Sequence, residues 1–136
     1  DSAAIINFGA RLDACKGACE LLKDNGYSLT LVDARFAKPL DHDLINRILD
    51  NHEFVITIEE GSIGGFGTSV LNYIHNIKKT PTKSVIKNII FPDKFIDHNS
   101  SENQYKEIGM NSESIAKKIL SMFSNDIISI SSYIKN

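Results

Sequence analysis

Four short apolar stretches alternate with segments of helical periodicity, and this alternation is the feature that most constrains the fold. The apolar stretches cover residues 3–8, 28–32, 54–58 and 85–91. Apolar residues recur at helical spacing in 11–25, after Asp41 and after Gly67. Apolar strands joined by helices are typical of a parallel sheet covered on both faces. We therefore expect an α/β fold of three layers, with a mostly parallel sheet of about four strands and helices on both faces.

The helical segments carry start and stop signals. Asp41 is a good N-cap for the second helix, and Asn25-Gly26 ends the first. After Gly67, Val70, Leu71, Ile74 and Ile77 are expected on one buried side of a helix. A short helix is predicted over 101–108, and residues 111–114 open another. The Ser- and Ile-rich residues after 123 have no assigned structure. We expect one domain over 1–123 and a C-terminal tail over 124–136.

Charge and cysteine usage narrow the classes of partner and site. A net charge of −2 over 136 residues gives no reason to expect a nucleic acid partner. No apolar run approaches the ~20 residues of a membrane helix, so no membrane partner is expected. Cys15 and Cys19 lie on the same face of a predicted helix and are interpreted as small buried residues. A metal site would need more ligands, and the four histidines show no ligand spacing.

Topology predicts where function would lie, because ligands of open parallel sheets usually bind at the carboxyl ends of the strands. The loop after the second strand there contains Asp33, Arg35, Lys38 and Asp41 around a proline. This mixture of charges suggests an internal ion-pair network or an interface. It contains no nucleophile paired with a base, so it is not a complete active site.

The loop after the third strand is rich in glycine. Its candidate interface residues are Glu59, Glu60, Gly61, Ser62, Gly64, Gly65 and Gly67. The spacing fits neither the dinucleotide-binding pattern nor the P-loop, and two glutamates would repel a phosphate. Close packing against the sheet or another domain is favoured over anion binding. Neighbouring Glu59 and Glu60 would point to opposite faces, so they cannot form an acid/base pair on one substrate.

Four motifs in this order resemble one family. Residues 33–41 read D-A-R-F-A-K-P-L-D, 59–67 read E-E-G-S-I-G-G-F-G, and 91–98 read F-P-D-K-F-I-D-H. With the opening F-G-A-R at 8–11, they are similar to segments of the 1-deoxyxylulose-5-phosphate synthases of the transketolase superfamily. The resemblance runs from about Ile5 to Phe123. The β subunits of 2-oxo-acid dehydrogenases share parts of it, and a free-standing anion- or nucleotide-binding domain is the other alternative.

The resemblance implies the C-terminal domain of a thiamine-diphosphate- and Mg²⁺-dependent transferase. Such an enzyme condenses pyruvate with glyceraldehyde 3-phosphate to 1-deoxyxylulose 5-phosphate, a precursor for isoprenoids. It also implies a homodimer whose preceding domains bind the cofactor. No catalytic, cofactor-binding or metal-binding residue is then expected in this chain, which would support the dimer and the domain arrangement and be inactive alone.

The resemblance also bears on the extent and location of the chain. Family members usually have an edge strand before the segment that matches Ala3. A fragment without that strand is therefore expected. The implied location is a plastid-type organelle, apicoplast-like, if the source is eukaryotic, and the cytoplasm if it is bacterial.

Overall fold

Four parallel strands form the centre of the molecule. The computed structural model describes residues 3–35, 39–60, 65–90 and 111–134, with side chains described as far as 125. The strands are β1 (Ala3–Phe8), β2 (Leu29–Asp33), β3 (Phe54–Glu59) and β4 (Val85–Ile90). They are hydrogen-bonded in the order β2-β1-β3-β4, and every neighbouring pair is parallel. The predicted parallel sheet of about four strands is confirmed.

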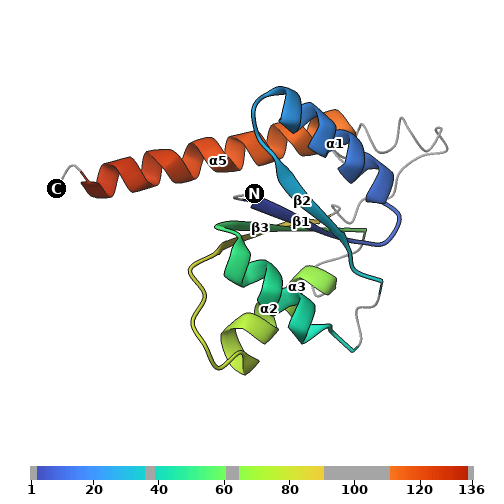
Figure 1. The fold of residues 1–136 in the computed structure, drawn as a ribbon, viewed down its shortest axis with the longest axis vertical. Coiled ribbons are helices and arrows are strands. Elements are labelled where there is room, and N and C mark those ends of the chain that lie inside the picture. The colour runs from blue at the N-terminus through green and yellow to red at the C-terminus, as the bar shows by residue number, and fades with distance from the viewer. Residues whose placement is uncertain (1–2, 36–38, 61–64, 91–110, 135–136) are drawn as a thin grey trace.

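Helices cover both faces of the sheet, also as predicted (Figure 1). One face carries α1 (Leu12–Asp24) and the start of α5 (Ser112–Ile134). The other carries α2 (His42–Asn51), α3 (Phe66–Asn72) and the π-helical turn η1 (Tyr73–Ile77). Within the part of the chain that the structure describes, no helix is both long and apolar enough to span a membrane.

Alternate residues of β1 supply the two cores. Ala3 and Ile5 pack with α1 and α5, whereas Ala4 and Ile6 pack with α2 and α3. This is the period of a strand, whose successive side chains point to opposite faces. Because both faces are covered, β1 is buried along nearly its whole length, and all of its residues except Asn7 are apolar.

The segment after α3 departs from the sequence prediction at Ile77. Val70 and Ile74 are buried as expected, but Ile77 is 53% exposed. The backbone N–H of Lys78 donates to the carbonyl of Tyr73, five residues back, so the last turn is a π-turn. A π-turn holds more residues than an α-turn, so it shifts Ile77 off the buried stripe. Placing Ile77 on the buried side was wrong.

α5 extends beyond the residues to which the sequence assigned a helix. Asn111 caps its start by accepting a hydrogen bond from the backbone N–H of Ser114 at 2.9 Å. The backbone then stays helical to Ile134, through the segment after 123 that had no assigned structure. The predicted helix over 101–108 and the motif at 91–98 lie outside the described residues.

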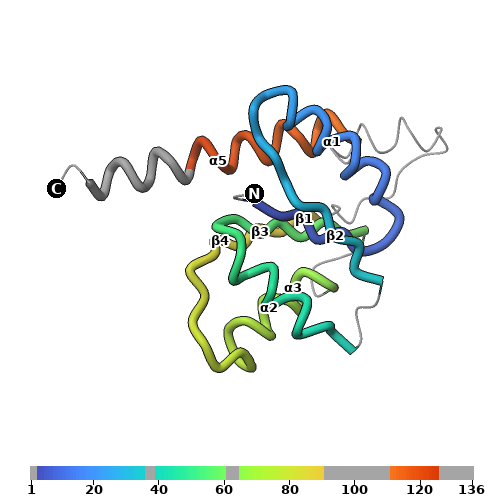
Figure 2. Tube along the Cα trace, viewed as in Figure 1, coloured from blue at the N-terminus to red at the C-terminus, as the bar shows by residue number. Residues whose placement is uncertain are grey.

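The chain leaves β1, β2 and β3 at the same end of the sheet (Figure 2). In the register, Asn7 lies beside Asp33 on one neighbour, and Phe8 lies beside Glu59 on the other. The carboxyl ends of three strands therefore meet at one edge, which we call the carboxyl edge. Both charged loops singled out in the sequence begin there.

Candidate functional site

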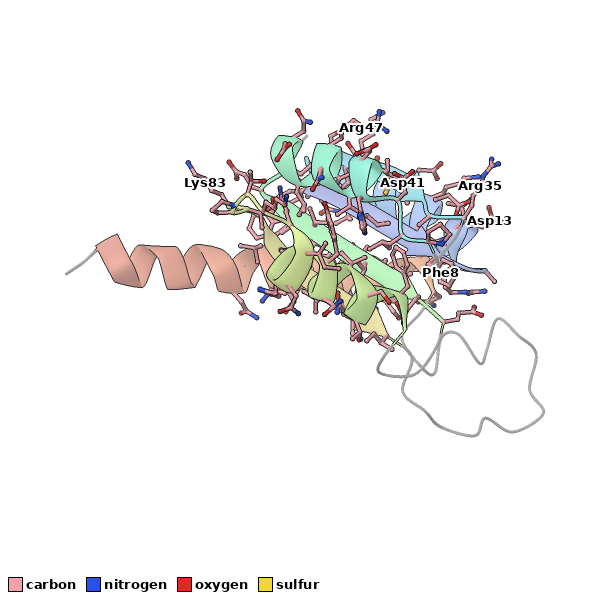
Figure 3. All side chains as sticks on the ribbon, turned by 90° about the horizontal axis from the view of Figure 1, so that it is seen from below. Phe8, Asp13, Arg35, Asp41, Arg47 and Lys83 are labelled. Atoms are coloured by element: carbon pink, nitrogen blue, oxygen red, sulfur yellow. The ribbon has the colours of Figure 1, made fainter. Side chains whose placement is uncertain are left out.

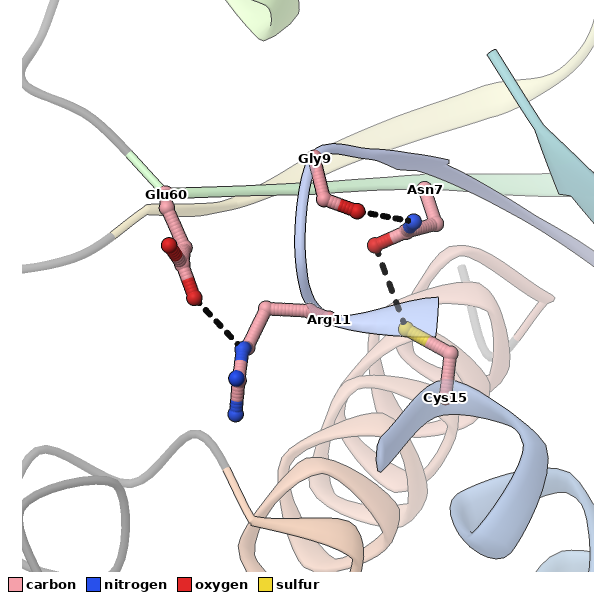
Figure 4. Close-up of polar contacts among 5 residues, drawn as sticks. All are labelled: Asn7, Gly9, Arg11, Cys15 and Glu60. Carbon is pink, nitrogen blue, oxygen red and sulfur yellow. Dashed lines mark hydrogen bonds and ion pairs between the residues drawn. The ribbon is translucent and has the colours of Figure 1, made fainter. Parts of the chain in front are cut away.

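A buried amide organises the carboxyl edge at the end of β1. Asn7 is fully buried, and its Nδ2 donates to the carbonyl of Gly9 at 3.1 Å and to Oδ1 of Asp33 at 3.4 Å. Its Oδ1 accepts from Sγ of Cys15 at 3.7 Å (Figure 4). Gly9 has φ of +95°, a conformation that favours glycine. Asn7 thus links the loop after β1 to the end of β2 and to α1.

An ion pair joins the loops that follow β1 and β3. Nε of Arg11 lies 2.6 Å from Oε1 of Glu60, across 49 positions of sequence (Figure 4). In the sheet order β2-β1-β3-β4, β2 lies on one side of β1, whereas β3 and β4 lie on the other. The order of the strands therefore reverses between β1 and β3, and the Arg11–Glu60 pair lies at the ends of these two strands. Ligands of open α/β sheets usually bind at that point. Here, two side chains of the domain itself meet at it.

The two adjacent glutamates have separate structural partners. Glu59 is only 2% exposed, and its Oε2 accepts a hydrogen bond from the backbone N–H of Gly67 in the first turn of α3. Glu60 is exposed and paired with Arg11. The prediction that they point apart is confirmed, and they do not form a matched acid/base pair.

The described part of the glycine-rich loop packs closely on the sheet. Gly65 is the N-cap residue of α3. A Cβ added at Gly67 would lie 2.8 Å from Oγ1 of Thr57 and 2.9 Å from Cγ of Asn88. Thr57 in turn donates to Oδ1 of Asn88 at 2.6 Å. Gly67 therefore lets α3 approach a polar pair on β3 and β4. Gly61, Ser62 and Gly64 lie outside the described residues.

The described residues of the charged loop after β2 border a hollow. Among the described residues there is no ion pair of Asp33, Arg35 or Asp41, and Lys38 lies outside them. Asp41 caps α2 by accepting from the backbone N–H of Leu44 at 2.9 Å, as predicted. The hollow has a volume of about 280 Å³, and we call it the α2 hollow. Its lining includes Asp33, Arg35, Leu40, Asp41, Leu44 and Phe66.

A second, more open hollow lies beside it. Its volume is about 410 Å³, and Leu40 lines both. The ring of His42 stacks on Tyr73 with centroids 4.0 Å apart, and the exposed Ile77 lies at its border. The Tyr73 hydroxyl donates to Oδ1 of Asn46 at 3.0 Å. Sequence analysis missed this aromatic pair, because His42 and Tyr73 come together only in the folded chain.

The interpretation of the cysteines as small buried residues is confirmed for Cys15, whereas Cys19 is only half-buried. Both are free thiols, and Cys15 is fully buried. Burial, with a smaller contribution from the neighbouring Cys19, raises the pKa of Cys15 to about 12, and Arg11 opposes this weakly. Burial also raises the pKa of Cys19. A thiol with so high a pKa is protonated at neutral pH and is a poor nucleophile.

The parallel sheet and the helices on both of its faces define a parallel α/β domain. Residues 1–115 match the family "Transketolase, C-terminal domain". The chain belongs to the transketolase C-terminal domain family, as the sequence resemblance indicated.

Two curated plant proteins illustrate the similarity. The chain is 40% identical over 119 residues to 1-deoxy-D-xylulose-5-phosphate synthase 1, chloroplastic, of Cannabis sativa. It is also 40% identical over 121 residues to the probable 1-deoxy-D-xylulose-5-phosphate synthase 2, chloroplastic, of Oryza sativa subsp. japonica. Each match covers 88% of this chain but only 17% of the relative. The chain therefore spans about a sixth of the length of these relatives.

Solved structures share the fold at lower sequence identity. A split-gene transketolase, described as an inactive beta4 tetramer, matches with a TM-score of 0.75 at 21% identity, over 88% of this chain and 38% of that one. Transketolase from Campylobacter jejuni matches with a TM-score of 0.61 at 15% identity, over 88% and 17%. At such identities the likeness supports the fold alone.

Proposed function

We propose that this chain is the C-terminal domain of a 1-deoxy-D-xylulose-5-phosphate synthase. Such an enzyme condenses pyruvate with glyceraldehyde 3-phosphate, releases carbon dioxide and forms 1-deoxyxylulose 5-phosphate. The observation that carries the proposal is the 40% identity over 88% of this chain to relatives bearing that name. The domain itself would position the cofactor-binding domains and support a homodimer.

The described residues at the carboxyl edge do not fit Mg²⁺, the ion that accompanies thiamine diphosphate in the proposed parent enzyme. Mg²⁺ prefers several oxygen ligands in near-octahedral geometry, usually carboxylates and phosphate oxygens. At the carboxyl edge, Glu59 accepts from the N–H of Gly67 and Glu60 pairs with Arg11. No cluster of three or more His, Cys, Asp or Glu side chains lies within the described ranges. We therefore assign the cofactor to the other domains of the parent polypeptide.

We propose that the two loops at the carboxyl edge contact a neighbouring domain. Asp33, Arg35, Asp41, Glu59, Glu60, Gly65 and Gly67 lie at or near the carboxyl edge. Glu60 pairs with Arg11 in the loop after β1, and Glu59 accepts from Gly67 at the start of α3, so both described ends of the glycine-rich loop are held in place. This suits a surface that must keep its shape against a neighbour. Because both plant relatives are chloroplastic, we propose a plastid-type location for the parent enzyme.

A paired assay tests the proposal. The parent polypeptide and this 136-residue chain are each incubated with pyruvate, glyceraldehyde 3-phosphate, thiamine diphosphate and Mg²⁺. We expect the parent to release carbon dioxide and form 1-deoxyxylulose 5-phosphate, and the 136-residue chain to do neither. A parent that turns over without thiamine diphosphate, or a 136-residue chain that is active alone, would contradict the assignment.

A further inference from the structure

The α2 hollow combines an apolar floor with a charged rim. Of its lining residues, Phe66 is buried and Leu40 and Leu44 are half-buried, and we call these the floor. Asp33, Arg35 and Asp41 are exposed, and we call these the rim. Its volume of about 280 Å³ is just below that of typical ligand pockets, which is ~300–1,000 Å³. A space of this size and lining suits one or two apolar side chains better than a large cofactor.

The rim charges are not equally available to a partner. Asp33 already accepts from Asn7, and Asp41 already accepts from the backbone N–H of Leu44. Arg35 is exposed and has no hydrogen bond or ion pair in the part of the chain that the structure describes. Figure 3 shows Arg35 at the same end of the molecule as Asp41, with its side chain directed outward. The guanidinium is the rim group left for a partner's acceptor.

The length of the relatives indicates which partner is available. The matching region is only 17% of each plant synthase. The rest of each relative belongs to the same polypeptide as its matching domain and could contact it there. An arginine beside an apolar pocket is a common anchor at protein interfaces, because its planar guanidinium binds carboxylates with two parallel hydrogen bonds.

We propose that the α2 hollow receives an apolar side chain from the cofactor-binding part of the same enzyme, with a nearby carboxylate of that segment paired to Arg35. This inference rests on the proposed function, because it takes its partner from the parent synthase. It makes Arg35 a docking residue rather than a catalytic one. The hollow is then filled only in the assembled enzyme.

Amide hydrogen exchange on the parent polypeptide tests the docking. We expect the amides of residues 40–44 to exchange at least about tenfold more slowly in the parent than in the 136-residue chain. Arg35→Glu in the parent should remove most of that protection, because it places a carboxylate opposite a carboxylate. Arg47→Glu is the matched control, since Arg47 is an exposed arginine of α2 outside the hollow's lining. It should leave the protection unchanged.

Arg35→Gln provides a second variant in case Arg35→Glu fails to fold. It keeps a polar side chain without the charge and should lose an intermediate share of the protection. Equal exchange in parent and 136-residue chain, or equal effects of the Arg35 and Arg47 variants, overturns the inference. So does protection that grows with the concentration of the 136-residue chain alone, because a second copy then fills the hollow. A parent that makes 1-deoxyxylulose 5-phosphate while residues 40–44 stay unprotected refutes the docking but not the proposed function.

Discussion

At the scale of single residues, Gly67 is a position where close packing of α3 on the sheet leaves no room for a side chain. We expect Gly67→Ala to lower the free energy of unfolding by about 1–3 kcal/mol, the usual cost of inserting a methyl group into packed structure. The added Cβ would lie 2.8 Å from Oγ1 of Thr57 and 2.9 Å from Cγ of Asn88, so α3 would have to move away from the sheet. Urea unfolding of both proteins measures the difference.

Gly17→Ala is the control for this substitution. The new Cβ there would lie 2.3 Å from Oγ and 3.0 Å from Cβ of Ser112. The hydroxyl can rotate away, so only the contact with Cβ requires a small shift, and alanine favours a helix interior by about 1 kcal/mol over glycine. Its loss of stability should be clearly smaller than that of Gly67→Ala. Equal losses would mean that contact with Thr57 and Asn88 is not what requires glycine at 67.

Cys15 gives the domain a pH-dependent contribution to stability in the alkaline range. The pKa of this thiol is about 12 when folded, against 9.0 for an unperturbed thiol, so the folded state holds the proton more tightly. Its contribution is complete below pH 9 and is lost as the pH rises toward 12. The slope is at most about 1.4 kcal/mol per pH unit.

The comparison with Cys15→Ala isolates this contribution from the other groups that titrate at high pH. We expect the stability difference between wild type and Cys15→Ala, measured by urea unfolding, to be constant below pH 9 and to move in the variant's favour above it. Parallel curves between pH 8 and 11 would show that Cys15 does not couple folding to protonation.

Residue-scale features differed in how well the sequence predicted them. Opposite directions for Glu59 and Glu60 followed from strand periodicity alone. The Arg11–Glu60 pair did not, because its partners are 49 positions apart and meet only when the order of the strands is known. The sequence places Asn7 in an apolar strand. No neighbouring residue indicates that its buried amide links the loop after β1 to the end of β2.

At the scale of elements, the N-cap of α2 offers the cleanest test. We expect Asp41→Ala to lower the free energy of unfolding by about 0.5–2 kcal/mol, since it removes the acceptor for the backbone N–H of Leu44. Asp41→Asn should retain most of the stability because its side-chain oxygen still accepts. Asp43→Ala is the control for the loss of charge near the helix N-terminus. Asp43 lies in the same first turn of α2, but the residue that caps the helix is Asp41. Chemical unfolding of the three variants distinguishes capping from charge.

Element types and order could be predicted from the sequence because each strand is rich in apolar residues and several elements have a local signal at one boundary. The boundary signals of β1, α1 and α2 are Gly9, Asn25-Gly26 and Asp41. The structure differs from the sequence prediction at Ile77 and after residue 123, where the local signals are weak. No residue type announces the π-turn that exposes Ile77, and the Ser-rich segment after 123 has low helix propensity although its backbone is helical.

At the scale of the whole molecule, α5 closes one of the two cores. Its residues Ile115, Ile119 and Phe123 are buried against α1 and the sheet, although the helix comes last in the chain. The sheet places β1, the first strand, in its interior, so β1 and the first turns of α5 contribute to the same core, while the later part of α5 extends away from the sheet (Figure 1). We therefore expect the domain to unfold as one cooperative unit, so that a destabilising substitution in α5 also lowers the stability of the sheet.

A substitution at Phe123 measures how far the stability of the sheet depends on α5. Its ring lies 5.1 Å from that of Phe54 in β3 and 5.3 Å from that of Tyr27, which follows α1, so it joins three parts of the fold. We expect Phe123→Ala to lower the free energy of unfolding by about 3–5 kcal/mol. The exposed Ser121→Ala on the same helix should change it by less than about 0.5 kcal/mol.

Two probes decide whether that loss is global. Far-UV circular dichroism follows the helices, and tyrosine fluorescence follows Tyr27 and the three other tyrosines during urea unfolding. If α5 and the sheet form one cooperative unit, both probes report the same lowered midpoint for Phe123→Ala. A variant in which helix is lost first, while the remaining transition keeps the wild-type midpoint, would mean that α5 docks onto a sheet that is already stable without it.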